Sequence, residues 1–148
     1  MYDTMELQKN TPKERSMNIL FFLRPKSGVT YLTLGNSLRQ GLEKMKNSGY
    51  TEVPVVDKEG IYIGTVSQGD FLWKILDEGF TDMQMAEHTQ IDSLVSKRNS
   101  PVRINTTMED LLSKAVEQNF VPVVDDFDAF VGIVTRKAII KYFAEKKA

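Results

Sequence analysis

Ser67 and Asp70 stand three residues apart, directly after a run of mostly apolar residues. A carboxylate carries two acceptor oxygens and the neighbouring hydroxyls of a ribose are two donors, so Asp70 could hold both hydroxyls while Ser67 orients the sugar. The same spacing also describes a helix start, with Ser67 as the N-cap and an acid at the third helical position. The residues alone leave the sugar site and the helix cap equally open.

A related turn occurs 68 residues later, where Thr135 takes the place of Ser67 and Ala138 the place of Asp70. Thr135 can still cap a helix, but Ala138 cannot accept a hydrogen bond from a sugar. Arg136 and Lys137 bring two cations to the first turn of that helix, whose backbone N–H groups already attract anions. Neutralising a phosphate and forming a solvated basic turn both remain possible roles for this pair.

The two turns belong to an internal repeat. The residues VPVVD occupy positions 53–57 and return at 121–125, and the spacing of 68 is kept through the residues that follow. Within a chain of 148 residues, this spacing predicts two similar halves that fold as one unit. We expect neither half to be stable alone.

The sequence of each half predicts the element order β-α-β-β-α. Ser37 and Gln40 form a capping box that starts a helix, and Gly49 is suited to end it. The apolar VPVVD strand is followed by a short polar turn and a second strand, which together predict a β-hairpin. The expected hairpin turns are 58–60 and 126–128, the second strands 61–66 and 130–134, the closing helices 70–76 and 136–143, and the helical lead-in segments 17–23 and 91–95.

These elements predict an α/β (α+β) fold with small mixed sheets, because fully apolar strands need amphipathic helices to cover them. The expected divisions are a flexible N-terminal extension at 1–16, a first repeat at 17–76, a connector at 77–90 and a second repeat at 91–148. The extension lacks a hydrophobic period, so either Met1 or Met17 could be the start. Trp73 is expected in the core or in a dimer interface.

Composition argues against several classes of function. The 19 basic and 20 acidic residues give a net charge of −1, so nucleic acid is not an expected partner. The chain has no cysteine and a single histidine, which leaves no basis for a thiolate site, a metal site or a catalytic triad, and we expect no enzyme. No apolar run approaches the ~20 residues of a membrane helix and no signal peptide is visible, so we expect a cytoplasmic protein.

The repeated order of elements and the Gly-x-x-Ser/Thr-x-x-Asp turn at 64–70 resemble a tandem pair of cystathionine-β-synthase (CBS) domains, known as a Bateman module. The resemblance covers residues 17–143. It implies a pseudo-twofold pair of repeats with two clefts between them, a homodimer, and regulatory ligands that contain adenosine, with no cofactor.

The resemblance also implies roles for particular residues. Ser67 and Asp70 would hold the ribose, and Thr135, Arg136 and Lys137 would lie on the phosphate side. No basic residue occupies 47–51, so Lys26 is a further candidate for phosphate. The implied adenine pocket comprises Gly28, Val29, Thr30, Tyr50, Thr51, Val53 and Thr65. Within it, Val53 could simply be core, and Tyr50 could stack on the base or only close the corner between helix and strand.

The predicted function is that of a regulator that binds AMP or a related adenosine compound and signals to an unidentified protein. One alternative is a cyclic di-AMP sensor, because residues 49–55 (GYTEVPV), 28–30 and the Thr-Arg-Lys turn resemble stand-alone bacterial CBS proteins that bind this dinucleotide. Another is a ligand-free dimerisation scaffold, which Ala138 favours.

Overall fold

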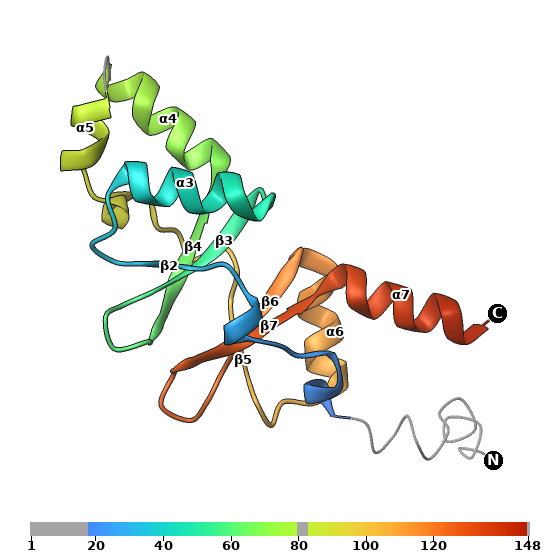
Figure 1. The fold of residues 1–148 in the computed structure, drawn as a ribbon. Coiled ribbons are helices and arrows are strands. Elements are labelled where there is room, and N and C mark those ends of the chain that lie inside the picture. The colour runs from blue at the N-terminus through green and yellow to red at the C-terminus, as the bar shows by residue number, and fades with distance from the viewer. Residues whose placement is uncertain (1–17, 80–82, 148) are drawn as a thin grey trace, which may run out of the picture.

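The structure is a computed structural model that describes residues 18–79 and 83–147. The described residues form two halves that repeat the same order of elements (Figure 1). The expected extension at 1–16 lies outside the described residues.

The first half follows the predicted order. In chain order it contains η1 (Ile19–Phe22), β1 (Arg24–Pro25), η2 (Lys26–Gly28), β2 (Leu32–Thr33), α3 (Leu38–Ser48), β3 (Glu52–Val56), β4 (Tyr62–Ser67) and α4 (Gln68–Glu78). The capping box is confirmed, since Ser37 Oγ accepts from the Gln40 N–H at 3.1 Å and Gln40 Oε1 accepts from the Ser37 N–H at 2.8 Å. Gly49 ends α3 in the left-handed conformation, with a φ of 76°.

The second half repeats this arrangement, except that its described elements include no counterpart of β1 or η2. It contains η3 (Ile91–Leu94), β5 (Val102–Arg103), α6 (Met108–Glu117), β6 (Phe120–Val124), β7 (Phe130–Thr135) and α7 (Arg136–Lys147). The expected connector at 77–90 also holds a short helix, α5 (Met83–His88), which the sequence analysis did not predict.

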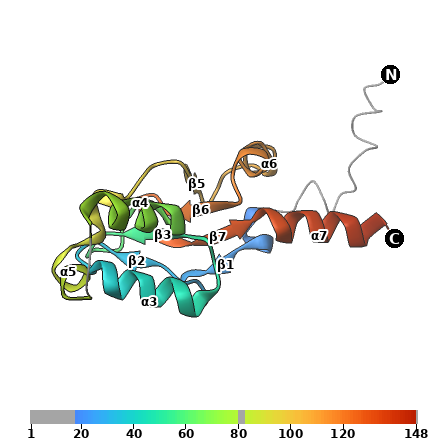
Figure 2. The same cartoon turned by 90° about the horizontal axis from the view of Figure 1, so that it is seen from above.

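Each half has one small mixed sheet. The first sheet has the order β2-β3-β4 and the second the order β1-β7-β6-β5. β2 runs parallel to β3 and β5 parallel to β6, whereas the two hairpins are antiparallel. Seen from above, α3 and α6 lie on opposite sides of the strands (Figure 2). The α/β class with small mixed sheets is therefore confirmed.

The aspartate that ends each VPVVD strand builds the hairpin turn. Asp57 Oδ1 accepts from the backbone N–H groups of Glu59 and Ile61 at 2.8 and 2.9 Å. Asp125 Oδ1 does the same in the second half, at 2.8 and 3.0 Å. These bonds fix the short polar turns that the sequence predicts, because a side-chain acceptor replaces the ladder bonds that the turn lacks.

The two halves exchange their lead-in segments. β1 pairs antiparallel with β7 of the other half, and Ser96 pairs in the same way with Thr65. Gly132 and Gly64 occupy the two crossing points. A Cβ at Gly132 would collide with the Arg24 carbonyl, and one at Gly64 with the Ser96 carbonyl. The repeated glycine is therefore required by the close approach of two backbones.

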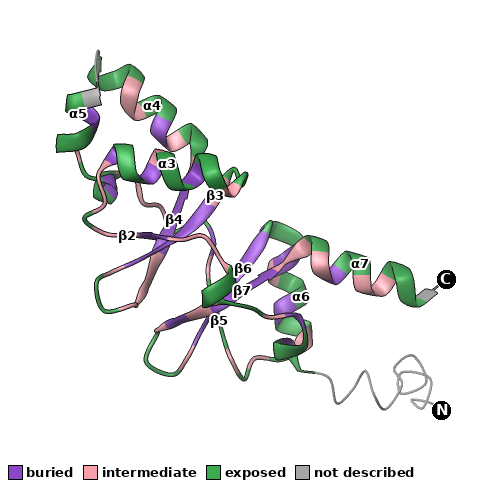
Figure 3. Cartoon of the chain, viewed as in Figure 1, coloured by how far each residue is buried: buried purple, intermediate pink, exposed green. Residues whose placement is uncertain are grey.

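The hydrophobic core of each half contains residues from the lead-in segment of the other half. Ile19 and Phe22 pack in the core of the second half with Val121 and Val134. Ile91 packs in the core of the first half. A third cluster joins the halves and contains Val56, Phe120, Phe130 and Ile133. Burial concentrates in the strands, while the outer helix faces are exposed (Figure 3).

Trp73 lies outside these cores. It is 65% exposed on α4, next to Leu72 at 55% and close to Leu76 at 61%. The prediction of a core position for Trp73 is therefore wrong within a single chain, because its side of α4 faces away from the sheet. The alternative prediction, an interface anchor, stays a prediction.

Candidate functional site

A pocket with a volume of about 300 Å³ lies where the two halves meet. Four short segments form its walls, two from each half. Its lining residues are Arg24, Val29, Thr30, Tyr50, Thr51, Glu52, Val53, Pro54, Asn119, Phe120, Ile133, Thr135 and Lys137. The pocket thus contains an apolar wall, several hydroxyls and two cations.

The exchange of lead-in segments explains why this pocket combines residues from both halves. β1 is hydrogen-bonded to β7, and η2 follows directly and stays close to β7. Val29 and Thr30 therefore lie beside Thr135, although they are more than 100 residues apart in the sequence. The pocket cannot form within one repeat.

Arg24 is a pocket residue that the sequence analysis missed. Its Nη1 donates to the Tyr50 hydroxyl at 2.5 Å, which fixes the guanidinium beside the ring. Lys137, in the first turn of α7, is exposed at the same pocket. Asn119 and Phe120 were also missed, although they lie 68 residues after Thr51 and Glu52 and the repeat spacing would have identified them.

Thr135 and Arg136 each make hydrogen bonds at the end of a helix, Thr135 at the start of α7 and Arg136 at the end of α6. Thr135 Oγ1 accepts from the Ala138 N–H at 3.1 Å and caps α7, as predicted. Arg136 Nε donates to the Ala115 carbonyl at 2.7 Å, and its Nη2 donates to the Val116 carbonyl at 3.2 Å. The guanidinium therefore satisfies carbonyls at the C-terminal end of α6, and Arg136 is not among the residues that line the pocket.

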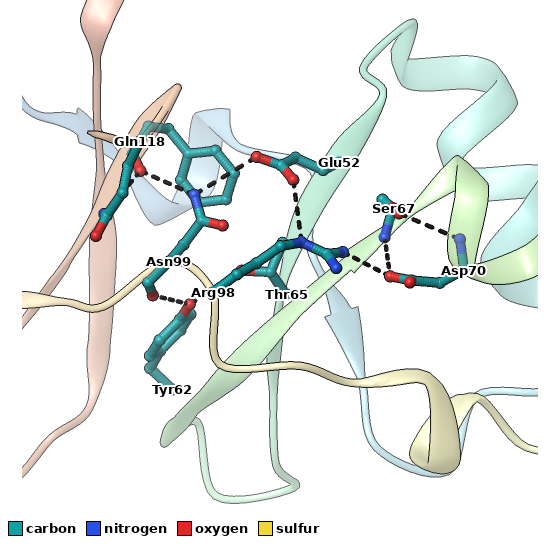
Figure 4. Close-up of polar contacts among 9 residues, drawn as sticks. Glu52, Tyr62, Thr65, Ser67, Asp70, Arg98, Asn99 and Gln118 are labelled. Carbon is teal, nitrogen blue, oxygen red and sulfur yellow. Dashed lines mark hydrogen bonds and ion pairs between the residues drawn. The ribbon is translucent and has the colours of Figure 1, made fainter. Parts of the chain in front are cut away.

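Ser67 and Asp70 form a complete capping box at the start of α4. Ser67 Oγ accepts from the Asp70 N–H at 3.2 Å, and Asp70 Oδ2 accepts from the Ser67 N–H at 2.8 Å. The same Oδ2 accepts from Arg98 Nη2 at 2.5 Å (Figure 4). Burial raises the pKa of the Asp70 carboxyl, but the bonds from Arg98 and Ser67 outweigh it and hold that pKa below its ordinary value.

Arg98 also connects Asp70 to Glu52, a residue of the pocket. Its Nε lies 3.4 Å from Glu52 Oε2, and the buried Asn99 donates to Glu52 Oε1 at 3.5 Å and to the Phe120 carbonyl at 3.1 Å (Figure 4). One guanidinium therefore faces two carboxylates, and the charge of Glu52 is compensated inside the protein.

Tyr62 and Thr65 stabilise the segment that carries Arg98. The Tyr62 hydroxyl donates to the Asn99 carbonyl at 2.6 Å and lies 3.1 Å from Thr65 Oγ1. Burial raises the pKa of Tyr62 to about 12, so this hydroxyl keeps its proton at all ordinary pH values. Thr65 is fully buried and pairs through its backbone with Ser96.

The structure divides the residues predicted from the sequence into two groups. Those brought together in the pocket are Val29, Thr30, Tyr50, Thr51, Val53, Thr135 and Lys137. Those absent from its lining are Gly28, Thr65, Ser67, Asp70 and Arg136. Lys26 lies with its ammonium 5.2 Å from the centre of the Tyr31 ring. The predicted sugar group and the predicted phosphate group therefore do not share one pocket.

A metal site and a membrane-spanning helix are both absent from the part of the chain that the structure describes. Within 18–79 and 83–147, no three His, Asp or Glu side chains gather closely enough to hold a metal ion. None of the helices found there has the length and apolar character needed to cross a membrane.

Comparison with known proteins places the chain in a family. The CBS domain model matches residues 23–77 and 91–145. An uncharacterized protein of Methanocaldococcus jannaschii is 31% identical over 125 residues, which cover 78% of this chain and 44% of that protein. The chain thus spans less than half the length of that relative.

Two other relatives have names that state a ligand. The crystal structure of CbpB in complex with c-di-AMP superimposes with a TM-score of 0.83 and 27% identity, covering 95% of this chain and 93% of the other. Cyclic di-AMP receptor B of Bacillus subtilis is 22% identical over 113 residues, covering 76% of this chain and 77% of that protein. With both repeats matched, the chain belongs to the CBS domain family and is a tandem CBS pair.

Proposed function

We propose that the pocket between the two halves binds cyclic di-AMP and that the chain is a regulator that reports this dinucleotide to a partner protein. The observation that carries the proposal is the composition of the pocket, which combines Arg24 and Lys137 with apolar walls but has Ala138 where a sugar-binding carboxylate would stand.

The position of the carboxylate distinguishes the candidate ligands. AMP has a free 2′,3′-diol, which a carboxylate can grip through both hydroxyls. In cyclic di-AMP each 3′ oxygen is esterified to phosphate, so no such diol exists. Asp70, on which the AMP prediction rests, is hydrogen-bonded to Arg98 and Ser67 and does not line the pocket. A pocket without this carboxylate suits a ligand without a diol.

The charges of the pocket suit phosphodiesters. Cyclic di-AMP carries two phosphodiester groups with one negative charge each. Arg24 and Lys137 are two cations in the same pocket, and Tyr50 holds the Arg24 guanidinium in place. Glu52 also lines the pocket, but its carboxylate already faces Arg98. Charge-assisted bonds to phosphate are about twice as strong as neutral ones.

The apolar side chains of the pocket suit a flat heterocycle. Val53, Phe120 and Ile133 are buried and line the pocket. Small-molecule sites usually combine such walls with a few polar groups. The CbpB structure in complex with c-di-AMP, at 27% identity, supports the same ligand for this chain.

The signal needs a partner, and we infer that two copies of the chain first associate through α4. Leu72, Trp73 and Leu76 are all more than half exposed on this helix. A cluster of large apolar side chains on a surface is typical of an interaction site. The partner protein can respond to the ligand only if it binds the ligand-bound form of the chain more tightly than the ligand-free form.

Titration of charge-reversal variants tests the site. Lys137→Glu should weaken cyclic di-AMP binding by at least about tenfold, because it replaces a phosphate partner with a repelling charge. Lys141→Glu changes the same charge on the same helix, outside the pocket, and should bind as the wild type does. Equal affinities of the two variants would exclude this pocket as the site, and absence of any binding by a folded wild-type chain would leave a ligand-free scaffold.

A further inference from the structure

We propose that a second cavity, at the C-terminal end of α3, is the subsite for the second adenosine of a cyclic dinucleotide and selects adenine over guanine. This inference rests on the proposed function and extends it from a pocket for one nucleotide to a site that recognises both halves of the ligand.

The second cavity adjoins the first. It has a volume of about 380 Å³ and is lined by Val29, Thr30, Tyr31, Lys44, Asn47 and Ser48. Val29 and Thr30 also line the first pocket, so these two residues form a common wall.

The volumes show why one cavity is not sufficient. Small-molecule pockets range from about 300 to about 1,000 Å³, so a pocket of about 300 Å³ lies at the small end of that range. It suits a single nucleotide. A cyclic dinucleotide is twice as large, and its second half must lie outside the first pocket, where the adjoining cavity of about 380 Å³ provides space.

The end of α3 provides the chemistry that selects adenine. The last carbonyls of a helix lack partners within the helix and carry partial negative charge. Adenine presents a donating N6 amino group on the edge where guanine presents the accepting O6. The Met45 carbonyl of α3 already accepts from the Gly49 N–H and the Ser48 hydroxyl. The negative end of the helix dipole, which lies at this end of α3, favours an adenine edge over a guanine edge.

Two side chains of α3 complete the subsite. Asn47 is exposed at the cavity, and a carboxamide can both accept from N6 and donate to N7 of adenine. Lys44 Nζ lies 3.4 Å from the Tyr31 carbonyl and 5.9 Å from the centre of the Tyr31 ring. Lys44 thus adds a cation to the second cavity, in addition to Arg24 and Lys137 in the first pocket, for the phosphodiester nearest the second adenosine.

The test compares three single variants of α3 by calorimetric titration with cyclic di-AMP, cyclic di-GMP and AMP. Lys44→Gln should weaken cyclic di-AMP binding about tenfold through the lost phosphate contact. It should leave AMP affinity unchanged, because AMP occupies only the first pocket. Asn47→Ala should narrow the preference for cyclic di-AMP over cyclic di-GMP. Lys46→Gln, an exposed change on the same helix outside both cavities, is the matched control.

The outcomes separate this inference from the function on which it rests. If Lys137→Glu weakens cyclic di-AMP binding but Lys44→Gln and Asn47→Ala behave like Lys46→Gln, the second subsite is wrong and the first pocket stands. Equal loss of AMP and cyclic di-AMP affinity in Lys44→Gln would likewise contradict a subsite specific to the second nucleotide. If Lys137→Glu has no effect on cyclic di-AMP, the proposed function itself fails.

Discussion

Asp70 accepts a 2.5 Å hydrogen bond from Arg98, a residue that follows η3 and lies 28 positions further along the chain. This pair joins the first turn of α4 to the segment that crosses β4. The carboxylate that the sequence assigns to a ribose therefore belongs to an internal network with Ser67 and Glu52 (Figure 4).

The first prediction concerns the stability that Arg98 provides. Arg98→Met keeps most of the aliphatic length but leaves Asp70 and Glu52 without their shared cation. Because the pair is partly exposed, the expected loss is about 1 kcal/mol of unfolding free energy, measured by urea denaturation. Arg103→Met removes a more exposed pair with Asp128 and should cost less. Equal losses of unfolding free energy in the two variants would show that the Asp70–Arg98 pair stabilises the fold no more than an exposed surface pair does.

The second prediction is the pH dependence of this pair. The pKa of Asp70 is lower in the folded chain than its ordinary value of 3.8. Such an acid stabilises the fold above its unfolded pKa, and its contribution is lost as the pH falls through the folded pKa. The difference in unfolding free energy between the wild type and Asp70→Asn should stay constant near neutral pH and shrink below about pH 4. A difference that does not change with acidification would contradict this account.

The third prediction concerns the crossing points of the exchanged segments. Gly132→Ala and Gly64→Ala each place a Cβ against a backbone carbonyl of the crossing segment, which cannot move like a flexible side chain. Each should cost about 1–3 kcal/mol of unfolding free energy or more. Gly69→Ala is the control, because its Cβ would meet only Ser67 Oγ at 3.6 Å, an ordinary contact. If all three variants are equally stable, the close approach does not explain the repeated glycine.

The fourth prediction tests the exposed face of α4. Trp73→Glu should shift a dimer toward the monomer in sedimentation equilibrium, because it places a charge in the inferred interface. Phe127 is 83% exposed at the tip of the second hairpin, and Phe127→Glu is the control for the loss of an exposed aromatic residue. A wild-type chain that sediments as a monomer, or identical behaviour of both variants, would contradict association through α4.

Local signals in the sequence predicted most of the fold. The Ser37 and Gln40 capping box, the Gly49 helix end and the polar hairpin turns each depend on a few adjacent residues. The internal repeat then extended each assignment to the second half. The CBS family followed from this order of elements and is confirmed by the family match.

The composition of the pocket could not be predicted in the same way. β1 contains only Arg24 and Pro25, too few residues to show a strand pattern, and its partner β7 is distant in sequence. Arg98 lies in a segment without periodicity, so nothing local connects it to Asp70. The assignment of Ser67 and Asp70 to a sugar stays a prediction, since the same residues satisfy the helix start by themselves.

The central claim is tested most directly by calorimetric titration of the wild-type chain with cyclic di-AMP and, separately, with AMP. The account predicts one cyclic di-AMP per chain, bound at least about tenfold more tightly than AMP, since only the dinucleotide brings two phosphodiesters to the two cations and needs no diol-binding carboxylate. Tighter binding of AMP than of cyclic di-AMP would contradict it.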